Sequence, residues 1–516
     1  MNGAQALIRT LVGAGVDVCF ANPGTSEMHF VAALDDVPEM RGVLTLFEGV
    51  ATGAADGYAR MAGKPAATLL HLGPGLGNGL ANLHNARRGR APVVNVVGDH
   101  ARSHKRLDAP LEADIDALAG AVSGWVRRSL SPADVAADAA EAVAESARRG
   151  IATLVLPADV SWEDGAEPAD PPPYWYPPVP TEYRLADVAA VLGRGEPTVL
   201  FLGGDVVASD EGLLAAGQVA AGTGARLMAE TFPARMVRGA GLPDLPKLPY
   251  PPEMAMAALA GTRHLVLAGA MSPVHFFGYP GVPGTPVPAD CTVHVLSAPG
   301  EDGVAALREL AAMAAAGAGG QQALLEPARP ELPSGELTPR TVSAVVGALL
   351  PERAVVVDEV LTSGVGLAEL TSGAPRHDWL SLTGGAIGDG LPMAVGAAVA
   401  CPDRPVLALQ ADGSAMYTIQ ALWTMAREQL DVTVLLYDNG SYAILQHELS
   451  RVGAAEDGKR AGELLHLGTP ALDFVALATG MGVPATRAST AEELADQLRT
   501  ALAEPGPHLV QAVLHG

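Results

Sequence analysis

An aspartate and an asparagine in the last third of the chain carry the side-chain oxygens that bind hard divalent cations. Asp412 follows the apolar run 406–410, and Asn439 follows the apolar run 433–437. Such runs are typical of strands buried in a parallel sheet, where ligands bind beyond the carboxyl ends of the strands. Because no His or Cys lies beside them, the pair favours Mg²⁺ or Ca²⁺, and Mg²⁺ needs few protein ligands when a phosphate completes its shell.

The residues that follow Asp412 could bind that phosphate. We predict one amphipathic helix over 414–430, and the free N–H groups of Gly413 and Ser414 at its start would favour an anion. A different interpretation is that Asp412 and Ser414 only cap the helix, and that Asn439-Gly440 is an ordinary turn. The position of both residues at strand ends favours the metal and phosphate interpretation.

A glutamate and a histidine in the first third are candidates for proton transfer. Glu48 ends the apolar run 43–47 and precedes a predicted helix over 49–61, so it could share a proton with a ring nitrogen of a ligand. His71 ends the predicted strand 66–71, and histidine titrates near neutral pH. Each has a plainer interpretation, because the helix dipole favours Glu in a first turn and a His at a strand end is commonly structural.

The glycine loop after His71 differs from a dinucleotide-binding loop. The order of its residues from Gly73 to Asn78 gives GxGxxN, whereas the dinucleotide fingerprint is GxGxxG. We therefore expect no nicotinamide cofactor.

Chain length and proline content indicate how these residues are positioned. At 516 residues the chain is long enough for about three domains. Proline-rich stretches at 167–180 and 316–335 predict linkers, which leave domains at 1–165, 185–315 and 336–516. In each, short Val- and Leu-rich runs alternate with helical stretches. This pattern predicts three α/β domains, each a doubly wound parallel sheet.

Charge and cysteine content exclude several classes of protein. The net charge is −24, which disfavours binding to nucleic acid or to an anionic membrane. The three cysteines are far apart and form no CxxC pair, so neither a disulfide framework nor a zinc site is expected. No leader or long uncharged apolar stretch is evident, and we expect a soluble cytoplasmic protein.

Two segments resemble motifs of thiamine-diphosphate-dependent enzymes. Ala411-Asp412-Gly413-Ser414, followed by Asn439-Gly440-Ser441, resembles a motif that usually reads Gly-Asp-Gly and then Asn-Asn. Glu48 followed by Gly57-Tyr58-Ala59-Arg60 looks like the catalytic glutamate region. The chain is similar over nearly its whole length to the acetolactate synthase large-subunit group and to benzoylformate decarboxylases. This resemblance implies aminopyrimidine-binding, middle and diphosphate-binding domains, with the cofactor between two subunits of a homodimer or homotetramer.

The resemblance also implies roles for individual residues. Three residues would supply oxygens to Mg²⁺: Asp412, Asn439 and, through its carbonyl, Ser441. Five would contact the diphosphate of the cofactor: Gly413, Ser414, Tyr442, Thr362 and Ser363. Ile387 would support thiamine diphosphate in a bent shape, Glu48 would protonate its aminopyrimidine, and His71 would transfer protons to substrate intermediates.

Six further residues correspond to substrate-binding positions: Thr25, Ser26, His275, Ile444, His447 and Glu448. Glu448 stands where acetolactate synthases carry a tryptophan, and Pro110-Leu111-Glu112 replaces their Phe-Gln-Glu. Because a buried carboxylate needs a partner, we expect Glu448 to meet a cation, a polar substrate or solvent. Ala411 and Asp438 also depart from the cofactor motif, and Asp438 could add negative charge beside the diphosphate.

The activity that the resemblance implies is cleavage or ligation of a C–C bond next to a carbonyl, dependent on thiamine diphosphate and Mg²⁺. Decarboxylation of a small-molecule 2-oxo acid, as in benzoylformate decarboxylase, is the first expectation. The alternatives are an acetolactate-synthase-like carboligase that joins two 2-oxo acids and a cofactor-binding paralogue without turnover. FAD is not expected, because no residue pattern in the middle part supports it.

Overall fold

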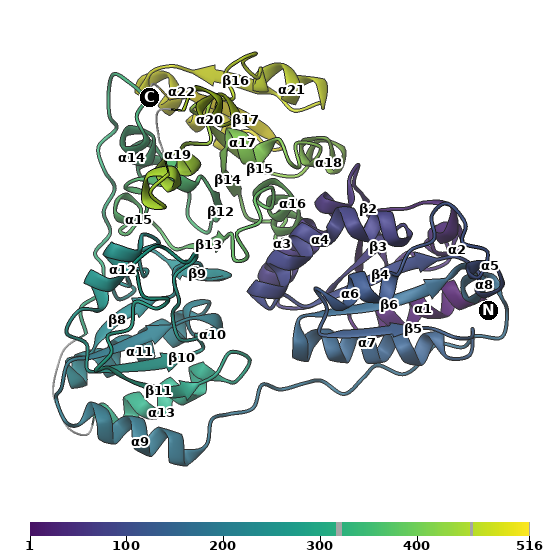
Figure 1. Cartoon of the computed structure of the whole chain (residues 1–516), viewed down its shortest axis with the longest axis horizontal. Helices are drawn as coiled ribbons and strands as arrows, with labels where there is room; N and C mark the ends of the chain where they lie inside the picture. Colours follow the sequence, from purple (N-terminus) through teal and green to yellow (C-terminus); the bar gives the residue numbers. More distant parts are fainter. Residues whose placement is uncertain (316–321, 455–457, 515–516) are drawn as a thin grey trace.

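The computed structural model describes residues 1–315, 322–454 and 458–514, which form three α/β regions, each around its own sheet (Figure 1). Neighbouring strands are parallel except at one edge, where β9 pairs with β13. In β4, Val93 and Val97 belong to one hydrophobic core, whereas Val94 and Val96 belong to another. The sheet is thus buried on both faces, as expected for a doubly wound fold.

The first region has the strand order β2-β1-β3-β4-β6-β5. Its strands are β1 (Val18–Asn22), β2 (Arg41–Leu44), β3 (Ala66–Leu70), β4 (Val93–Asp99), β5 (Trp125–Arg128) and β6 (Ile151–Pro157). Its helices are α1 (Gly3–Gly13), η1 (Thr25–Glu27), α2 (Met28–Ala33), α3 (Glu48–Ala62), α4 (Leu72–Gly89), α5 (Arg102–Lys105), α6 (Ile115–Gly120), α7 (Val135–Arg149) and α8 (Ala158–Trp162). The helix predicted over 49–61 is confirmed as α3, which ends at Gly63 in the left-handed conformation.

The middle region has the strand order β11-β10-β7-β8. Its strands are β7 (Thr198–Leu202), β8 (Arg226–Ala229), β10 (His264–Ala268) and β11 (Thr292–Ser297). Its helices are α9 (Glu182–Leu192), α10 (Gly204–Val207), α11 (Asp210–Thr223), α12 (Pro252–Leu259) and α13 (Gly303–Ala315). Between β8 and α12 the chain leaves this sheet, and β9 (Arg235–Arg238) forms an edge of the third sheet.

The third sheet has the order β16-β17-β15-β14-β12-β13-β9. Its other strands are β12 (Val355–Glu359), β13 (His377–Ser381), β14 (Val406–Ala411), β15 (Val432–Asp438), β16 (Ala485–Ala488) and β17 (His508–Val513). Its helices are α14 (Pro339–Leu349), η2 (Leu361–Gly364), α15 (Leu367–Leu370), α16 (Gly390–Ala400), α17 (Asp412–Ala415), α18 (Ala421–Glu428), α19 (Ala443–Arg451), α20 (Lys459–Leu464), α21 (Phe474–Gly480) and α22 (Ala491–Ala503). Numbered from its own first strand and without β9, this sheet repeats the strand order of the first.

The single helix predicted over 414–430 is wrong. The chain forms α17 and α18 with a tighter turn between them, in which Tyr417 and Thr418 donate their N–H groups three residues back, to Ser414 and Ala415. The turn brings the Thr418 hydroxyl to the carbonyl of Gly388, 2.9 Å away. This tertiary hydrogen bond explains why the amphipathic pattern does not continue as one helix.

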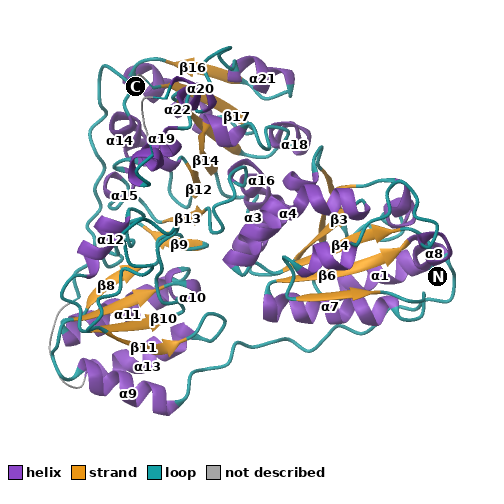
Figure 2. Ribbon diagram, viewed as in Figure 1, coloured by secondary structure: helices purple, strands orange, loops and turns teal. Residues whose placement is uncertain are grey.

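The connections between the regions are long and irregular. The predicted linker 167–180 has no helix or strand and runs from the first region toward α9 (Figure 2). Of the predicted linker 316–335, residues 316–321 lie outside the described residues, and 322–335 form no helix or strand. Among the helices that the structure describes, none combines the length and apolar character needed to cross a bilayer.

Helix α3 of the first region packs tightly against α16 of the third (Figure 1). A methyl group on Gly57 would lie 2.1 Å from the Met393 carbonyl oxygen, so the backbones touch without side chains between them. Beside this contact Arg60 forms two hydrogen bonds with buried Asp56, at 2.8 and 2.6 Å. Both carboxylate oxygens of buried Asp389 lack a hydrogen-bond partner within the described residues.

We predict that Asp389→Asn makes stability less dependent on pH. Burial, then the charges of Asp56 and Glu359, raise the pKa of the Asp389 carboxyl well above its ordinary value, although Arg60 opposes them. The folded state therefore favours the protonated carboxyl. This stabilisation is complete below the unfolded-chain pKa of about 3.9 and is lost as the pH rises through the folded-state pKa.

Thermal unfolding between about pH 5 and pH 8 checks this prediction. The melting temperature of the wild type should fall relative to that of Asp389→Asn as the pH rises. Parallel pH profiles for the two proteins would contradict it.

Candidate active site

A hollow opens at the point where the strand order of the third sheet reverses, between β12 and β14. It encloses about 310 Å³, part of which is open to solvent. Its lining includes all the residues that the sequence singled out for cofactor or metal binding: Thr362, Ser363, Ile387, Asp412, Gly413, Ser414, Asn439, Ser441 and Tyr442. The substrate candidate Ile444 also lines it. Segments far apart in the sequence thus converge on one space.

Asp412 is fixed by backbone donors from α17 and from the loop after β15. Its Oδ1 accepts the N–H of Gly413 at 2.7 Å, and its Oδ2 accepts the N–H groups of Gly440 at 2.8 Å and Asn439 at 3.2 Å. The N-cap residue of α17 is Ala411, and the Asp412 carboxylate accepts an N–H from the start of α17 and two more from Asn439 and Gly440, so it does more than cap a helix. Burial raises the pKa of the Asp412 carboxyl to about 6, and the nearby Asp438 adds to the shift.

Asn439 and Ser414 present further polar atoms to the hollow. Asn439 Oδ1 accepts the N–H of Ser441 at 3.0 Å, and its amide lies 3.4 Å from the Ser363 hydroxyl. The Ser414 hydroxyl donates to the Ala411 carbonyl at 3.1 Å and accepts from Gln410 at 2.7 Å. The oxygens of Asp412 and Asn439 therefore share a space with hydroxyl groups and a helix start, a set of donors and acceptors that fits a hard cation and a phosphate.

The departures at Ala411 and Asp438 have different places in the structure. Ala411 lines the hollow. Asp438 is not among the lining residues described: its carboxylate accepts from Gln511 Nε2 at 2.7 Å and from the Gly440 N–H at 3.2 Å. The charge of Asp438 is thus held by Gln511 beside the hollow.

In the first region, η1 and the end of β3 bring three side chains together. His71 Nδ1 lies 2.7 Å from Glu27 Oε2, and the Ser26 hydroxyl lies 2.7 Å from Glu27 Oε1 and 3.3 Å from His71 Nδ1. Glu27 is fully buried, and a methyl group on Gly98 would lie 1.6 Å from its carboxylate. Thr25, the other residue predicted here, is exposed.

Sequence reasoning did not single out Glu27. An acidic residue in a Pro-Gly loop is usually exposed, and its partner His71 is 44 residues further along the chain. Without Glu27, the partly exposed imidazole of His71 would lack this partner, which fixes its orientation and tautomer. A positioned histidine of this kind can hold or move a proton.

Glu48 begins α3 and lies close to this histidine. It is 7% exposed, and its Oε2 accepts from Asn78 Nδ2 at 2.9 Å. A methyl group on Gly75 would lie 3.3 Å from Glu48 Oε1 and 3.4 Å from His71 Cβ, so both side chains border the same glycine. The segment from Gly73 to Asn78, predicted as a loop, is instead the start of α4, and the missing side chain at Gly75 lets both proton-transfer candidates lie close to this helix.

The hollow and the cluster formed by Glu48, His71 and Glu27 (the Glu48 cluster) lie at the ends of different sheets. The described lining residues of the hollow come from 360–444, whereas Glu48, His71 and Glu27 belong to the first region. In Figure 1, α3 and α16 pack between the two sheets. One chain therefore presents the two groups of candidate residues separately.

The remaining substrate candidates lie around α19 and the loop 271–284. Glu448 meets a cation, as expected, because Arg451 Nη1 lies 2.6 Å from its carboxylate. The Arg451 guanidinium also lies 5.8 Å from the ring centre of Tyr279 in the loop. His447 is exposed, and His275 Nε2 is buried without a partner in the described part of the chain. Neither histidine is among the described residues that line the hollow.

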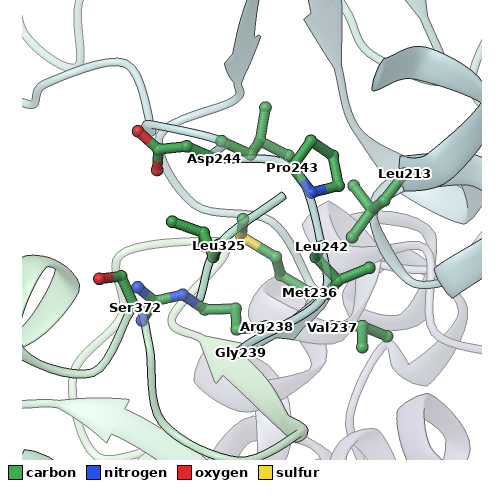
Figure 3. A pocket seen from close by; sticks show the side chains of 11 residues that line it. Leu213, Met236, Val237, Arg238, Gly239, Leu242, Pro243, Asp244, Leu325 and Ser372 are labelled. Carbon is green, nitrogen blue, oxygen red and sulfur yellow. The ribbon is translucent and has the colours of Figure 1, made fainter. Parts of the chain in front are cut away.

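A second hollow lies between the middle region and the third sheet (Figure 3). Its cation, Arg238, is already engaged by the Thr371 hydroxyl at 3.1 Å, the Ala368 carbonyl at 2.6 Å and the face of Trp379. Burial lowers the pKa of Arg238 to about 10. We assign this hollow to the packing between the regions.

Two family models match the chain. The thiamine pyrophosphate enzyme N-terminal TPP binding domain matches residues 1–119, and the C-terminal TPP binding domain matches residues 364–512. The first range contains the Glu48 cluster, and the second contains Asp412, Asn439 and Ile387. The chain belongs to the thiamine pyrophosphate enzyme family, thiamine pyrophosphate being thiamine diphosphate. The resemblance seen in the sequence is confirmed.

Curated relatives span the chain almost completely. It is 62% identical to "Putative acetolactate synthase large subunit IlvX" of Mycobacterium tuberculosis, over 100% of this chain and 99% of that protein. It is 31% identical to the benzoylformate decarboxylase of Pseudomonas aeruginosa, over 96% of each. Among solved structures, the 4-hydroxybenzoylformate decarboxylase of Rhodococcus jostii has a TM-score of 0.87 at 25% identity, covering 100% and 99%.

We predict that Glu27 and His71 stabilise the fold as a coupled pair. Glu27→Gln and His71→Ala should each lower the free energy of unfolding by about 1–3 kcal/mol, because each removes or weakens the hydrogen bond between His71 Nδ1 and the buried Glu27 carboxylate. The double variant should lose about 1 kcal/mol less than the sum of the two. Denaturant unfolding of all four proteins measures the coupling, and additive losses would show that the contact is energetically neutral.

Proposed function

We propose that the protein binds thiamine diphosphate with Mg²⁺ in the hollow and decarboxylates a 2-oxo acid. The observation that carries the proposal is the convergence of Asp412 and Asn439 with Ser414 and Tyr442 at the switch point of the third sheet. Two oxygen side chains and the Ser441 carbonyl suit Mg²⁺, whose remaining ligands would be phosphate and water. Within the described residues no group of three His, Cys, Asp or Glu side chains forms a metal cluster, so the diphosphate would have to complete the shell.

The protein's own residues would bind and orient the cofactor and handle protons. Thr362, Ser363, Ser414 and Tyr442 have hydroxyl groups for the diphosphate, and Ile387 supplies an apolar support. Glu48, held by Asn78, would hold a proton at the aminopyrimidine, and His71 would hold or deliver one at the substrate. When bound, the cofactor supplies the carbanion chemistry.

A complete site requires a second copy of the chain in this proposal. Glu48 lies in the first region and the hollow in the third, and the described lining of the hollow includes no residue of the first region. A two-fold dimer would place the Glu48 cluster of one subunit at the hollow of its partner, giving two equal sites. A homodimer is then the smallest active assembly, and a homotetramer would contain two.

The residues that follow Ile444 on α19 favour a substrate pocket with a polar part. Glu448 follows Ile444 by one helical turn of α19, so the Glu448–Arg451 ion pair extends the same face. Phe276, in the loop that also carries Tyr279, packs against Gly385, since a methyl group there would lie 2.3 Å from the Phe276 ring. An oxo acid with an aromatic and a polar part would suit this combination.

A second candidate function is an acetolactate-synthase-like carboligase, favoured by the name of the 62% identical relative. A cofactor-binding protein without turnover is disfavoured, because Glu48 is kept buried beside His71. We expect no FAD, because the Asp205 carboxylate accepts the N–H groups of Gly303 at 2.8 Å and Val304 at 3.2 Å. A carboxylate thus occupies the start of α13, where a nucleotide phosphate could otherwise bind. A cytoplasmic location remains our expectation.

Carbon dioxide release from a panel of pyruvate, branched-chain and aromatic 2-oxo acids tests the proposal. An aldehyde product supports the decarboxylase, and an acyloin product supports the carboligase. Tight cofactor binding without release from any of these acids would contradict decarboxylation within this panel.

We predict that Glu48→Gln leaves cofactor affinity largely unchanged but slows exchange of the cofactor C2 proton by about 100-fold or more, because an amide cannot replace the carboxyl in proton transfer. NMR-detected deuterium exchange measures the rate. Glu39→Gln, an exposed glutamate of the same region, is the matched control and should exchange like the wild type. Near-wild-type exchange in Glu48→Gln would overturn the role of Glu48.

We predict that Asp412→Ala abolishes the Mg²⁺-dependent part of cofactor binding, because it removes a charged oxygen ligand. Calorimetry with thiamine diphosphate, with and without Mg²⁺, measures the effect. Asp496→Ala removes an exposed carboxylate on α22 and should bind normally. Unchanged affinity in Asp412→Ala would show that Asp412 does not bind Mg²⁺.

A further inference from the structure

The turn that carries Ile387 lies between β13 and α16 and belongs to no strand or helix. Gly385 and Gly388, on either side of Ile387, have φ angles of +75° and +95°, which favour glycine. Because the turn is outside the sheet ladder, its backbone N–H and C=O groups need partners elsewhere. The structure supplies them from side chains of three other elements.

The first set of partners comes from α4 in the first region. Asn85 Nδ2 donates to the Ala386 carbonyl at 2.8 Å, and Asn85 Oδ1 accepts the Ala386 N–H at 3.2 Å. Asn82 Nδ2 donates to the Gly388 carbonyl at 3.1 Å and to the Gly49 carbonyl at 2.8 Å. The two asparagines are themselves joined, at 3.1 Å, and both are buried.

The second partner is Glu359, at the end of β12. Its carboxylate accepts the N–H groups of Gly388 at 2.7 Å and Gly390 at 2.8 Å. Gln410 Nε2 donates both to Glu359, at 2.9 Å, and to the Ser414 hydroxyl, at 2.7 Å. Gln410 therefore links Glu359, which fixes the Ile387 turn, to the Ser414 hydroxyl on another wall of the hollow.

A methyl group on Gly390 would lie 2.7 Å from Glu359 Oε2 and 2.4 Å from Gln410 Oε1. Glycine at this position therefore lets the backbone approach the carboxylate closely. The Thr418 hydroxyl, from the turn between α17 and α18, gives the Gly388 carbonyl another donor. Each peptide group beside Ile387 is thus fixed by a side chain from a distant part of the chain.

We infer that Asn82, Asn85 and Glu359 are positioning residues that fix the position of Ile387 in the hollow before the cofactor binds. The inference rests on the proposed function, because Ile387 would support thiamine diphosphate there. Asn82 has a second effect: by holding Gly49, the residue after Glu48, it ties the start of α3 to the turn. A displacement of the Ile387 turn would therefore also displace the start of α3, the helix that begins with Glu48.

A purely structural role would predict a different outcome on substitution. Buried asparagines that only stabilise the fold lower the melting temperature and leave the turn and the cofactor unaffected. Asn95 in β4 serves as the matched control, because it is fully buried and hydrogen-bonded to Thr68 at 2.7 Å and Thr153 at 2.9 Å. It lies in the sheet of the first region and has no hydrogen bond to the Ile387 turn in the described residues.

The first test is amide hydrogen–deuterium exchange of the full-length protein without added cofactor. Peptides covering 384–390 should exchange about tenfold faster in Asn82→Ala, Asn85→Ala and Glu359→Gln than in the wild type. In Asn95→Ala the same peptides should match the wild type. Wild-type protection of 384–390 in all three positioning variants would overturn the inference.

The second test measures the cofactor. With thiamine diphosphate and Mg²⁺, the three variants should bind about tenfold more weakly by calorimetry and should exchange the C2 proton more slowly at saturation. Asn95→Ala should do neither, whatever its melting temperature. Equal affinity and exchange in the positioning variants and in Asn95→Ala would overturn the inference.

The two tests separate this inference from the proposed function. If the wild type binds no thiamine diphosphate, the proposed function fails, and the amide exchange of 384–390 still decides whether the side chains hold the turn. If the wild type binds and the positioning variants behave like Asn95→Ala, the inference alone fails. Should an alanine variant not fold, Asn82→Ser and Asn85→Ser shorten the same side chains with a smaller loss of polar contact.

Discussion

The packing of α3 against α16 is the contact on which the arrangement of the site depends. The helices approach so closely that methyl groups on Gly57 and Gly396 would lie 2.1 and 1.9 Å from backbone carbonyl oxygens of the facing helix. Such a contact has a single well-defined geometry, because close-packed backbones cannot slide without collision. Glu48 begins α3, and the turn with Ile387 leads into α16. One contact therefore sets the relative positions of the first sheet and the third.

The first and third sheets repeat the same strand order, and each has candidate functional side chains where that order reverses. At the first switch point, buried Glu27 orients His71 and Glu48 lies across a glycine from it. At the switch point of the third sheet, Asp412 and Asn439 border the hollow. Since these groups lie at the ends of separate sheets, the proposed chemistry needs an assembly that brings a first region to a third region of another copy.

Much of this arrangement could be predicted from the sequence. The strands predicted from the runs 66–71, 406–410 and 433–437 agree with the structure to within one residue at each end, because strands buried on both faces are continuous apolar runs between turns. Asp412 and Asn439 were predictable because they follow strand ends, whereas Ile387, Thr362 and Ser363 were predicted only through the family resemblance. Glu27 and Asn85 were missed because their partners, His71 and Ala386, lie 44 and 301 residues away and leave no local pattern.

Two further differences between the predicted and the observed structure have the same physical origin, a contact between residues distant in sequence. The amphipathic pattern of 414–430 predicted one helix, but a hydrogen bond from Thr418 to Gly388 favours a turn inside it. The short strand β9 lies in the middle part of the sequence, yet it pairs with β13, where Arg235 also contacts Asp378 at 2.7 Å. In both cases a contact distant in sequence outweighs the local preference.

The most direct test of the account is complementation between two variants that each lack one half of the site. Glu48→Gln and Asp412→Ala, co-expressed with different tags and purified together, form mixed dimers in which one of the two sites has both residues intact. Exchange of the cofactor C2 proton should be nearly absent in each variant alone. It should recover to about a quarter of the wild-type rate per subunit after random pairing, because half the dimers are mixed and each has one intact site. No recovery in mixed dimers that are shown to form would contradict a site shared between two chains.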